Sequence, residues 1–140
     1  MKITKLFAVL TLLFIGSLKA HSQTKTGQVY LIRVTGYTGM AINYRFFIDD
    51  KLVCKMKNKL YSIHDLPVGE HTVTINSGGI SNGKKSAPLK IVVAEGKINY
   101  VNVFSTQAGY SNKITCQEIT KDSADPLLAK AKQKTDCAAE

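Results

Sequence analysis

The stretch INYRFFIDDKLVCKMK, residues 42–57, decides the fold. Apolar residues recur at every second position on both sides of Asp49-Asp50, which is the pattern of half-buried strands joined by a tight turn. In the second half Leu52, Cys54 and Met56 share one face, and the alternating face carries lysines and therefore faces water. The stretch predicts a β-hairpin.

The same period of two continues outward in both directions, from Gln28 to Thr120, with glycines and prolines between the apolar runs. No run has the length or period of a crossover helix, so we expect antiparallel rather than parallel pairing. The sequence thus predicts a mainly β fold over residues 23–121, an antiparallel β-sandwich of about 7–8 strands, immunoglobulin-like or prealbumin-like. The expected strands cover residues 29–34, 42–48, 51–57, 60–63, 71–75, 89–93, 98–104 and 113–120.

Residues 122–140 change period and predict a short C-terminal α-helix followed by a tail. Asp125 is a suitable N-cap, and Pro126 suits the first helical position. The helix formers Leu127 to Lys134 follow. A single short helix is marginal by itself, so we expect it to dock on the sheet.

Residues 1–22 have the three parts of a secretory signal peptide. Lys2 and Lys5 precede an apolar run over residues 6–15, and small residues follow it. We place the cleavage before Gln23, with cleavage after Ala20 as the alternative. An uncleaved anchor is disfavoured because the run is shorter than the about 20 residues that a transmembrane helix needs. The chain is therefore expected to be exported, to the periplasm or beyond the cell, with no transmembrane span after cleavage.

The length of 140 residues allows one domain, and the net charge is +9. Cleavage removes three lysines, which leaves a mature charge of +6. An exported chain rarely meets nucleic acid. An envelope protein, an anionic envelope polymer or lipid head groups are the expected counterparts of this charge. The sequence leaves the oligomeric state open.

The chain has three cysteines, Cys54, Cys116 and Cys137, in a compartment that favours oxidation. Cys54 and Cys116 both fall on the apolar phase of their strands and could pair inside the sandwich. Alternatively, a helix that returns along the last strand would bring Cys137 level with Cys116, and we favour this second pairing as a staple for the helix. A buried Cys54 explains that residue more simply than a redox role does.

Two groups of polar residues could form a binding site. His64-Asp65 and Glu70-His71 flank the turn at Pro67-Val68-Gly69 and could together hold a zinc ion. Against this, the two acids could simply fix the turn while the histidines stay solvated. If Val29 and Leu31 face inward, Arg33 does too, and it then needs an acidic partner such as Glu70 or Glu118. A structural ion pair or a solvated face is favoured over an anion site.

The order of several aromatic, turn and charged residues resembles a bacterial family, the domain of unknown function 2846, found in small exported proteins and lipoproteins. The resemblance covers about residues 28–120 and implies the fold and compartment, but no active site, because the family carries no established activity. This chain departs from it by Asp50-Lys51 in place of Asp-Gly and by lacking a lipid-attachment cysteine. The residues that carry the resemblance are Tyr30, Arg33, Ile48-Asp49-Asp50, Tyr61, Leu66-Pro67-Val68-Gly69-Glu70-His71 and Asn99-Tyr100-Val101.

No motif predicts catalysis. The loop Gly78–Ser86 resembles a phosphate-binding loop, but Lys85 stands where that motif needs Ser or Thr. No serine has an evident neighbouring base. We therefore expect a non-enzymatic cell-envelope β-sandwich that binds or scaffolds other components. The alternative is a small-ligand or metal-binding module that uses His64, His71 and Arg33.

Overall fold

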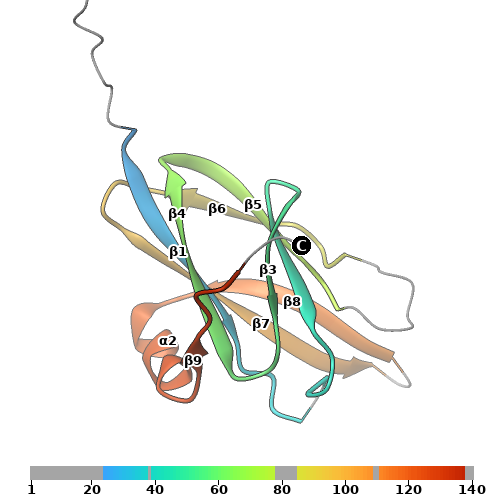
Figure 1. The fold of residues 1–140 in the computed structure, drawn as a ribbon. Helices are drawn as coiled ribbons and strands as arrows, with labels where there is room; N and C mark the ends of the chain where they lie inside the picture. The colour runs from blue at the N-terminus through green and yellow to red at the C-terminus, as the bar shows by residue number, and fades with distance from the viewer. Residues whose placement is uncertain (1–23, 38, 78–84, 109–110, 138–140) are drawn as a thin grey trace, which may run out of the picture.

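The computed structural model describes residues 24–37, 39–77, 85–108 and 111–137, and it consists of two β-sheets stacked face to face (Figure 1). The expected signal peptide and most of the Gly78–Ser86 loop lie outside these residues. The mainly β fold and the sandwich arrangement are confirmed. All eight predicted strands are present, and the described residues contain a ninth, two-residue strand near the C-terminus.

The first sheet has the strand order β8-β7-β1-β4-β9. Its strands are β1 (Thr26–Arg33), β4 (Leu60–Pro67), β7 (Ile98–Ala108), β8 (Ser111–Ile119) and β9 (Lys132–Gln133). The second sheet has the order β3-β2-β5-β6. Its strands are β2 (Tyr44–Ile48), β3 (Lys51–Met56), β5 (Gly69–Asn76) and β6 (Leu89–Val93).

The β2–β3 hairpin forms where the sequence predicts it. Asp49 and Asp50 have φ angles of 49° and 62°, and a two-residue turn with both angles positive matches the twist of the strands that it joins. The pairing shifts between Phe46 and Phe47, which leaves Val53 as an extra residue in β3. Cys54 and Met56 face the core, as the alternation predicts, and Val53 packs against the same core.

The expectation of purely antiparallel pairing is wrong at two places. β1 pairs in parallel with β7, with Tyr30 opposite Tyr100, and β4 pairs in parallel with β9. The expectation rested on the absence of crossover helices between consecutive strands. Here the long connection that parallel pairing needs is supplied by the strands of the chain between β1 and β7, because several of them form the other sheet.

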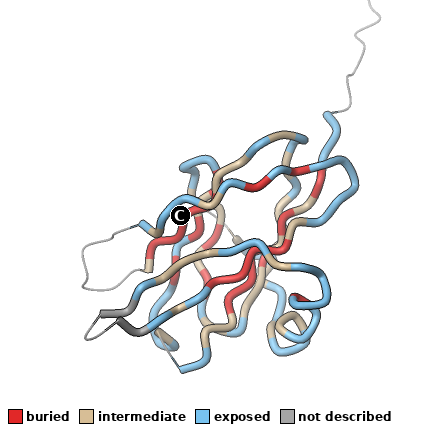
Figure 2. Tube along the Cα trace, turned by 180° about the vertical axis from the view of Figure 1, so that it is seen from behind, coloured by how far each residue is buried: buried red, intermediate tan, exposed pale blue. Residues whose placement is uncertain are grey.

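The core lies between the two sheets, where the buried stretches of neighbouring strands meet (Figure 2). Its largest fully buried apolar side chains come from both sheets, as expected for a sandwich. They include Leu31, Val29 and Val101 from the first sheet, and Tyr44, Phe46, Met56, Ile75 and Ile91 from the second.

A second, smaller cluster lies on the outer face of the first sheet, under the helix α2 (Lys121–Leu128). Ile32 and Tyr100 are buried against Ala124 of this helix, so the central strand β1 is covered on both faces. The helix docks on the sheet as expected, but its predicted position is wrong. It begins after Thr120, whose side chain accepts a hydrogen bond from the Ser123 amide. In the described part of the chain, no helix is both long and apolar enough to span a bilayer.

The C-terminal segment covers one open side of the sandwich. The Lys132 amide donates to the Lys59 carbonyl at 3.0 Å and the Lys134 amide to Tyr61 at 2.8 Å, so the segment extends the edge of β4. Cys137 then forms a disulfide with Cys54 of β3, in the other sheet. Both cysteine pairings considered from the sequence are therefore wrong in the structure. The favoured pairing of Cys116 with Cys137 assumed a helix up to Cys137, whereas the helix ends at Leu128 and the chain continues as the strand β9.

Candidate functional site

Arg33, the last residue of β1, lies inside the sandwich and is 0 % exposed. Its guanidinium group donates hydrogen bonds to three backbone carbonyl oxygens, those of Gly39 and Ile42, both at 2.7 Å, and that of Met56. It also lies 3.5 Å from the centre of the Tyr44 ring, which is a cation–π contact. Arg33 thus joins β1, β3 and the β1–β2 connection at one end of the molecule.

The expectation of an acidic partner for Arg33 is wrong. Glu70 forms an ion pair with Lys90, and Glu118 accepts a hydrogen bond from Asn99. Burial lowers the pKa of Arg33 to about 10, and the charge interaction and side-chain hydrogen bond with Tyr44 oppose this shift. The group therefore remains charged at neutral pH. Neutral carbonyl dipoles and an aromatic face replace the carboxylate, because the fork of N–H donors on arginine can reach several carbonyls at once.

The β1–β2 connection is held at its other end by Asn58, in the β3–β4 turn. The Asn58 side chain accepts a hydrogen bond from the Thr35 amide and donates one to the Gly36 carbonyl. Gly39 has a φ angle of 68°, and a Cβ there would collide with the Tyr44 hydroxyl. Glycine is therefore required at the point where this connection passes over Tyr44.

The β1–β2 connection, which Arg33 and Asn58 hold in place, exposes large apolar side chains. Tyr37 is 93 % exposed, Met40 53 % and Ile42 40 %. These are three of the seven exposed large hydrophobic residues in the described part of the chain, within six positions of one another. The other four are spread over the β4–β5 turn, β6 and β7, with Val92 on β6. Singly exposed apolar residues are ordinary, whereas three within a short, hydrogen-bonded connection call for an explanation.

Exposed lysines lie on the segments next to this connection. Lys57 and Lys59 are exposed on the β3–β4 turn, which Asn58 bonds to the β1–β2 connection. Lys130 and Lys132 are exposed next to it, because the Lys132 amide bonds to Lys59. Figure 1 shows these segments at one end of the sandwich. We call this surface the basic end, defined by Tyr37, Met40, Ile42, Lys57, Lys59, Lys130 and Lys132.

Acidic residues gather at the opposite end of the sandwich, near the β2–β3 and β4–β5 turns (Figure 1). Three lysines there are paired, Lys25 with Glu95, Lys85 with Asp50 and Lys90 with Glu70. Among the described residues no ion pair involves the four lysines of the basic end. The positive charge at that end is therefore not neutralised by neighbouring carboxylates.

His71 joins the β2–β3 and β4–β5 turns, at the end of the sandwich opposite the basic end, and takes no part in a metal site. Its Nδ1 lies 2.6 Å from an Asp49 oxygen, and its Nε2 lies 2.8 Å from the Pro67 carbonyl. A carbonyl and a carboxylate only accept, so both ring nitrogens donate and the ring is an imidazolium. The hydrogen bond to Asp49 raises the pKa of His71, and it lowers the pKa of Asp49.

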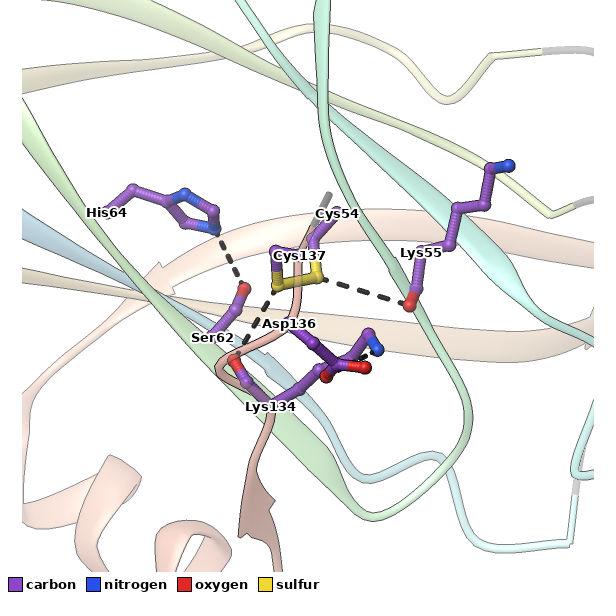
Figure 3. The surroundings of a disulfide bond; sticks show 7 residues. All are labelled: Cys54, Lys55, Ser62, His64, Lys134, Asp136 and Cys137. Carbon is purple, nitrogen blue, oxygen red and sulfur yellow. Dashed lines mark hydrogen bonds and ion pairs between the residues drawn. A yellow bond between two sulfur atoms is a disulfide. The ribbon is translucent and has the colours of Figure 1, made fainter. Parts of the chain in front are cut away.

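His64 lies elsewhere, between the sheets and next to the disulfide (Figure 3). Its Nε2 is 2.9 Å from the Ser62 hydroxyl, so the expectation that no serine has a neighbouring base is wrong. Ser62 is nevertheless 0 % exposed, and burial lowers the pKa of His64, which keeps the ring neutral. Asp65 accepts from Gln28 and does not orient the ring. The pair satisfies a buried hydroxyl and gives no substrate access to it.

The polar residues predicted to converge around the β4–β5 turn are not brought together. His64, Glu70 and His71 each have separate partners, and Arg33 is at the basic end. Within the described ranges no group of three or more His, Cys, Asp or Glu side chains could hold a metal ion.

The third cysteine, Cys116, is half-buried against β5, and burial raises the pKa of its thiol.

Neither protein-family models nor curated protein sequences give a match to this chain. The resemblance to the domain of unknown function 2846 therefore stays a prediction. The basic end was not predicted from the sequence, because Tyr37 and Met40 lie between two expected strands and Ile42 begins the second of them. The available signal was the pair Gly36 and Gly39, which bracket an aromatic residue in a turn region.

Proposed function

We propose that the protein is a non-enzymatic binding module of the cell envelope, exported by its N-terminal segment, and that it makes contact through the basic end. The signal-peptide pattern of residues 1–22 and the disulfide between Cys54 and Cys137 support the export. The proposal includes an immunoglobulin-like or prealbumin-like type of sandwich, which the two stacked, mostly antiparallel sheets support.

The main observation behind the proposal is that the buried Arg33 holds the β1–β2 connection by hydrogen bonds. A buried arginine without a carboxylate is costly to desolvate, and here its hydrogen bonds hold a connection that exposes Tyr37, Met40 and Ile42. A fixed backbone reduces the entropy lost when such side chains bind a partner. Aromatic and methionine side chains are enriched in protein contact surfaces, which further supports a binding role.

The reactive side chains support contact rather than catalysis. Ser62 and His64 bond to each other under the C-terminal segment, and His71 is committed to Asp49 and Pro67. The alternative, a metal or small-ligand module, needs His64, His71 and Arg33 at a common site. Each of them has its own structural partners, so the binding module is the better-supported function.

Sedimentation with isolated envelope membranes tests this proposal. The wild-type protein is expected to sediment with the membranes, and the variant Tyr37→Ser/Met40→Ser is expected to stay largely in solution. Val92→Ser is the matched control, because it removes an apolar side chain that is 68 % exposed on another element. Equal binding of the double variant and the wild type would show that the basic end is not the contact surface.

A further inference from the structure

We infer that the basic end binds the surface of an anionic lipid bilayer, with its apolar side chains entering the head-group region and its lysines contacting the lipid phosphates. This inference rests on the proposed binding function and names the partner. It draws on two features that occur together only at this end of the described structure, a group of exposed apolar side chains and lysines without carboxylate partners.

The apolar side chains are of the kind that interfaces between water and lipid accommodate. Tyrosine places a ring and a hydroxyl at head-group depth, and methionine and isoleucine are apolar enough to reach the first acyl carbons. An anionic polysaccharide would bind lysines but would gain little from Met40 and Ile42. The combination therefore favours a lipid surface over a soluble polyanion.

The lysines supply the second half of the recognition. Lys57 and Lys59 lie on the turn bonded to the apolar connection, and Lys132 is joined to Lys59 through a backbone hydrogen bond. A lysine near an anionic membrane contributes about 1 kcal/mol, which corresponds to roughly a fivefold change in affinity. Charge alone would bind weakly, and the apolar group alone would not select anionic lipid, so both features are needed together.

The fold keeps this contact surface fixed. Arg33 and Asn58 hold the β1–β2 connection through hydrogen bonds to its carbonyls and to the Thr35 amide. At the opposite end three lysines are paired with carboxylates, so that end carries less uncompensated positive charge than the basic end does. The charge distribution thus orients the protein with the basic end towards the bilayer.

The test uses the exported protein and lipid vesicles of defined composition, either phosphatidylcholine alone or phosphatidylcholine with phosphatidylglycerol. We expect binding to the anionic vesicles to be at least about tenfold tighter than to the neutral ones, and to weaken at 1 M NaCl. Lys57→Gln/Lys59→Gln should weaken binding to anionic vesicles roughly 30-fold. Tyr37→Ser/Met40→Ser should weaken it at least about tenfold.

Matched control variants remove side chains of the same kinds, lysine and apolar, away from the basic end. Lys51→Gln/Lys97→Gln removes two exposed lysines from the opposite end, and Val92→Ser removes an exposed apolar side chain. Both should bind anionic vesicles within about twofold of the wild type. Circular dichroism verifies that every variant keeps its β fold before binding is compared.

Three results would overturn the inference. The first is absence of binding to anionic vesicles. The second is binding to neutral vesicles as tight as to anionic ones. The third is an equal loss of binding to anionic vesicles in the test and control variants. If the vesicles fail but envelope membranes still bind through Tyr37 and Met40, the proposed function stands and lipid is not the partner. Protease treatment of those membranes would then abolish binding if the partner is a protein.

Discussion

Reducing the bond between Cys54 and Cys137, or replacing both residues by alanine, should destabilise the fold substantially. The two cysteines are 83 positions apart. In the chain-entropy description, closing a loop of this length restricts the unfolded state by about 4.5 kcal/mol at 25 °C. The Cys116–Cys137 pairing would close a loop of about 20 residues and contribute only about 3 kcal/mol. The magnitude therefore helps to identify the pair.

Urea unfolding followed by circular dichroism measures this contribution. The oxidised wild type should be about 4 kcal/mol more stable than the reduced protein and the Cys54→Ala/Cys137→Ala variant. Cys116→Ser is the matched control, because it leaves the disulfide intact and changes a half-buried side chain. It should cost less than about 1 kcal/mol.

Two measurements accompany the unfolding experiment. Without the disulfide, the amide hydrogens of Lys132 and Lys134 should exchange faster, because only the short β4–β9 pairing and its flanking backbone hydrogen bonds would hold this segment. A digest without reductant should contain Cys54 linked to Cys137. A peptide that links Cys116 to either residue, or equal stability of the oxidised and reduced proteins, would refute the reasoning.

Two further substitutions and one mass measurement test other features of the protein. Arg33→Met should destabilise the protein by about 2–4 kcal/mol in urea unfolding, because it leaves buried carbonyls without donors. His71→Gln should cost about 1 kcal/mol at pH 5.5 and less at pH 9. The raised pKa of His71 makes its contribution complete below the unfolded pKa of about 6.5 and removes it as the pH rises through the folded value. The exported protein should have the intact mass of a chain that begins at Gln23, and a mass that includes residues 1–22 would contradict export with cleavage.

The strands could be predicted from the sequence because alternation is a local signal. The hairpin at Asp49-Asp50 and the turn at Val68 follow from residues within a few positions of each other. The parallel pairing of β1 with β7 does not, because residues far apart in the chain meet there. The helix was misplaced because Pro126 suggested a start, whereas Thr120 caps the helix and Pro126 lies inside it.

The candidate site was less predictable than the fold. The inward orientation of Arg33 followed from the alternation with Val29 and Leu31, but its carbonyl partners come from β3 and the β1–β2 connection. No local pattern indicates that an arginine will be satisfied by backbone groups. The disulfide was missed for a related reason, since it depends on where the chain goes after Leu128.

Hydrogen exchange of the exported protein, measured by mass spectrometry with and without its envelope membranes, tests most directly where contact occurs. The account predicts that membranes slow exchange in peptides covering residues 35–42 and 57–60, and leave the β2–β3 hairpin at Asp49 unchanged. Protection at the Asp49 hairpin or along β6, with no change at the basic end, would contradict it.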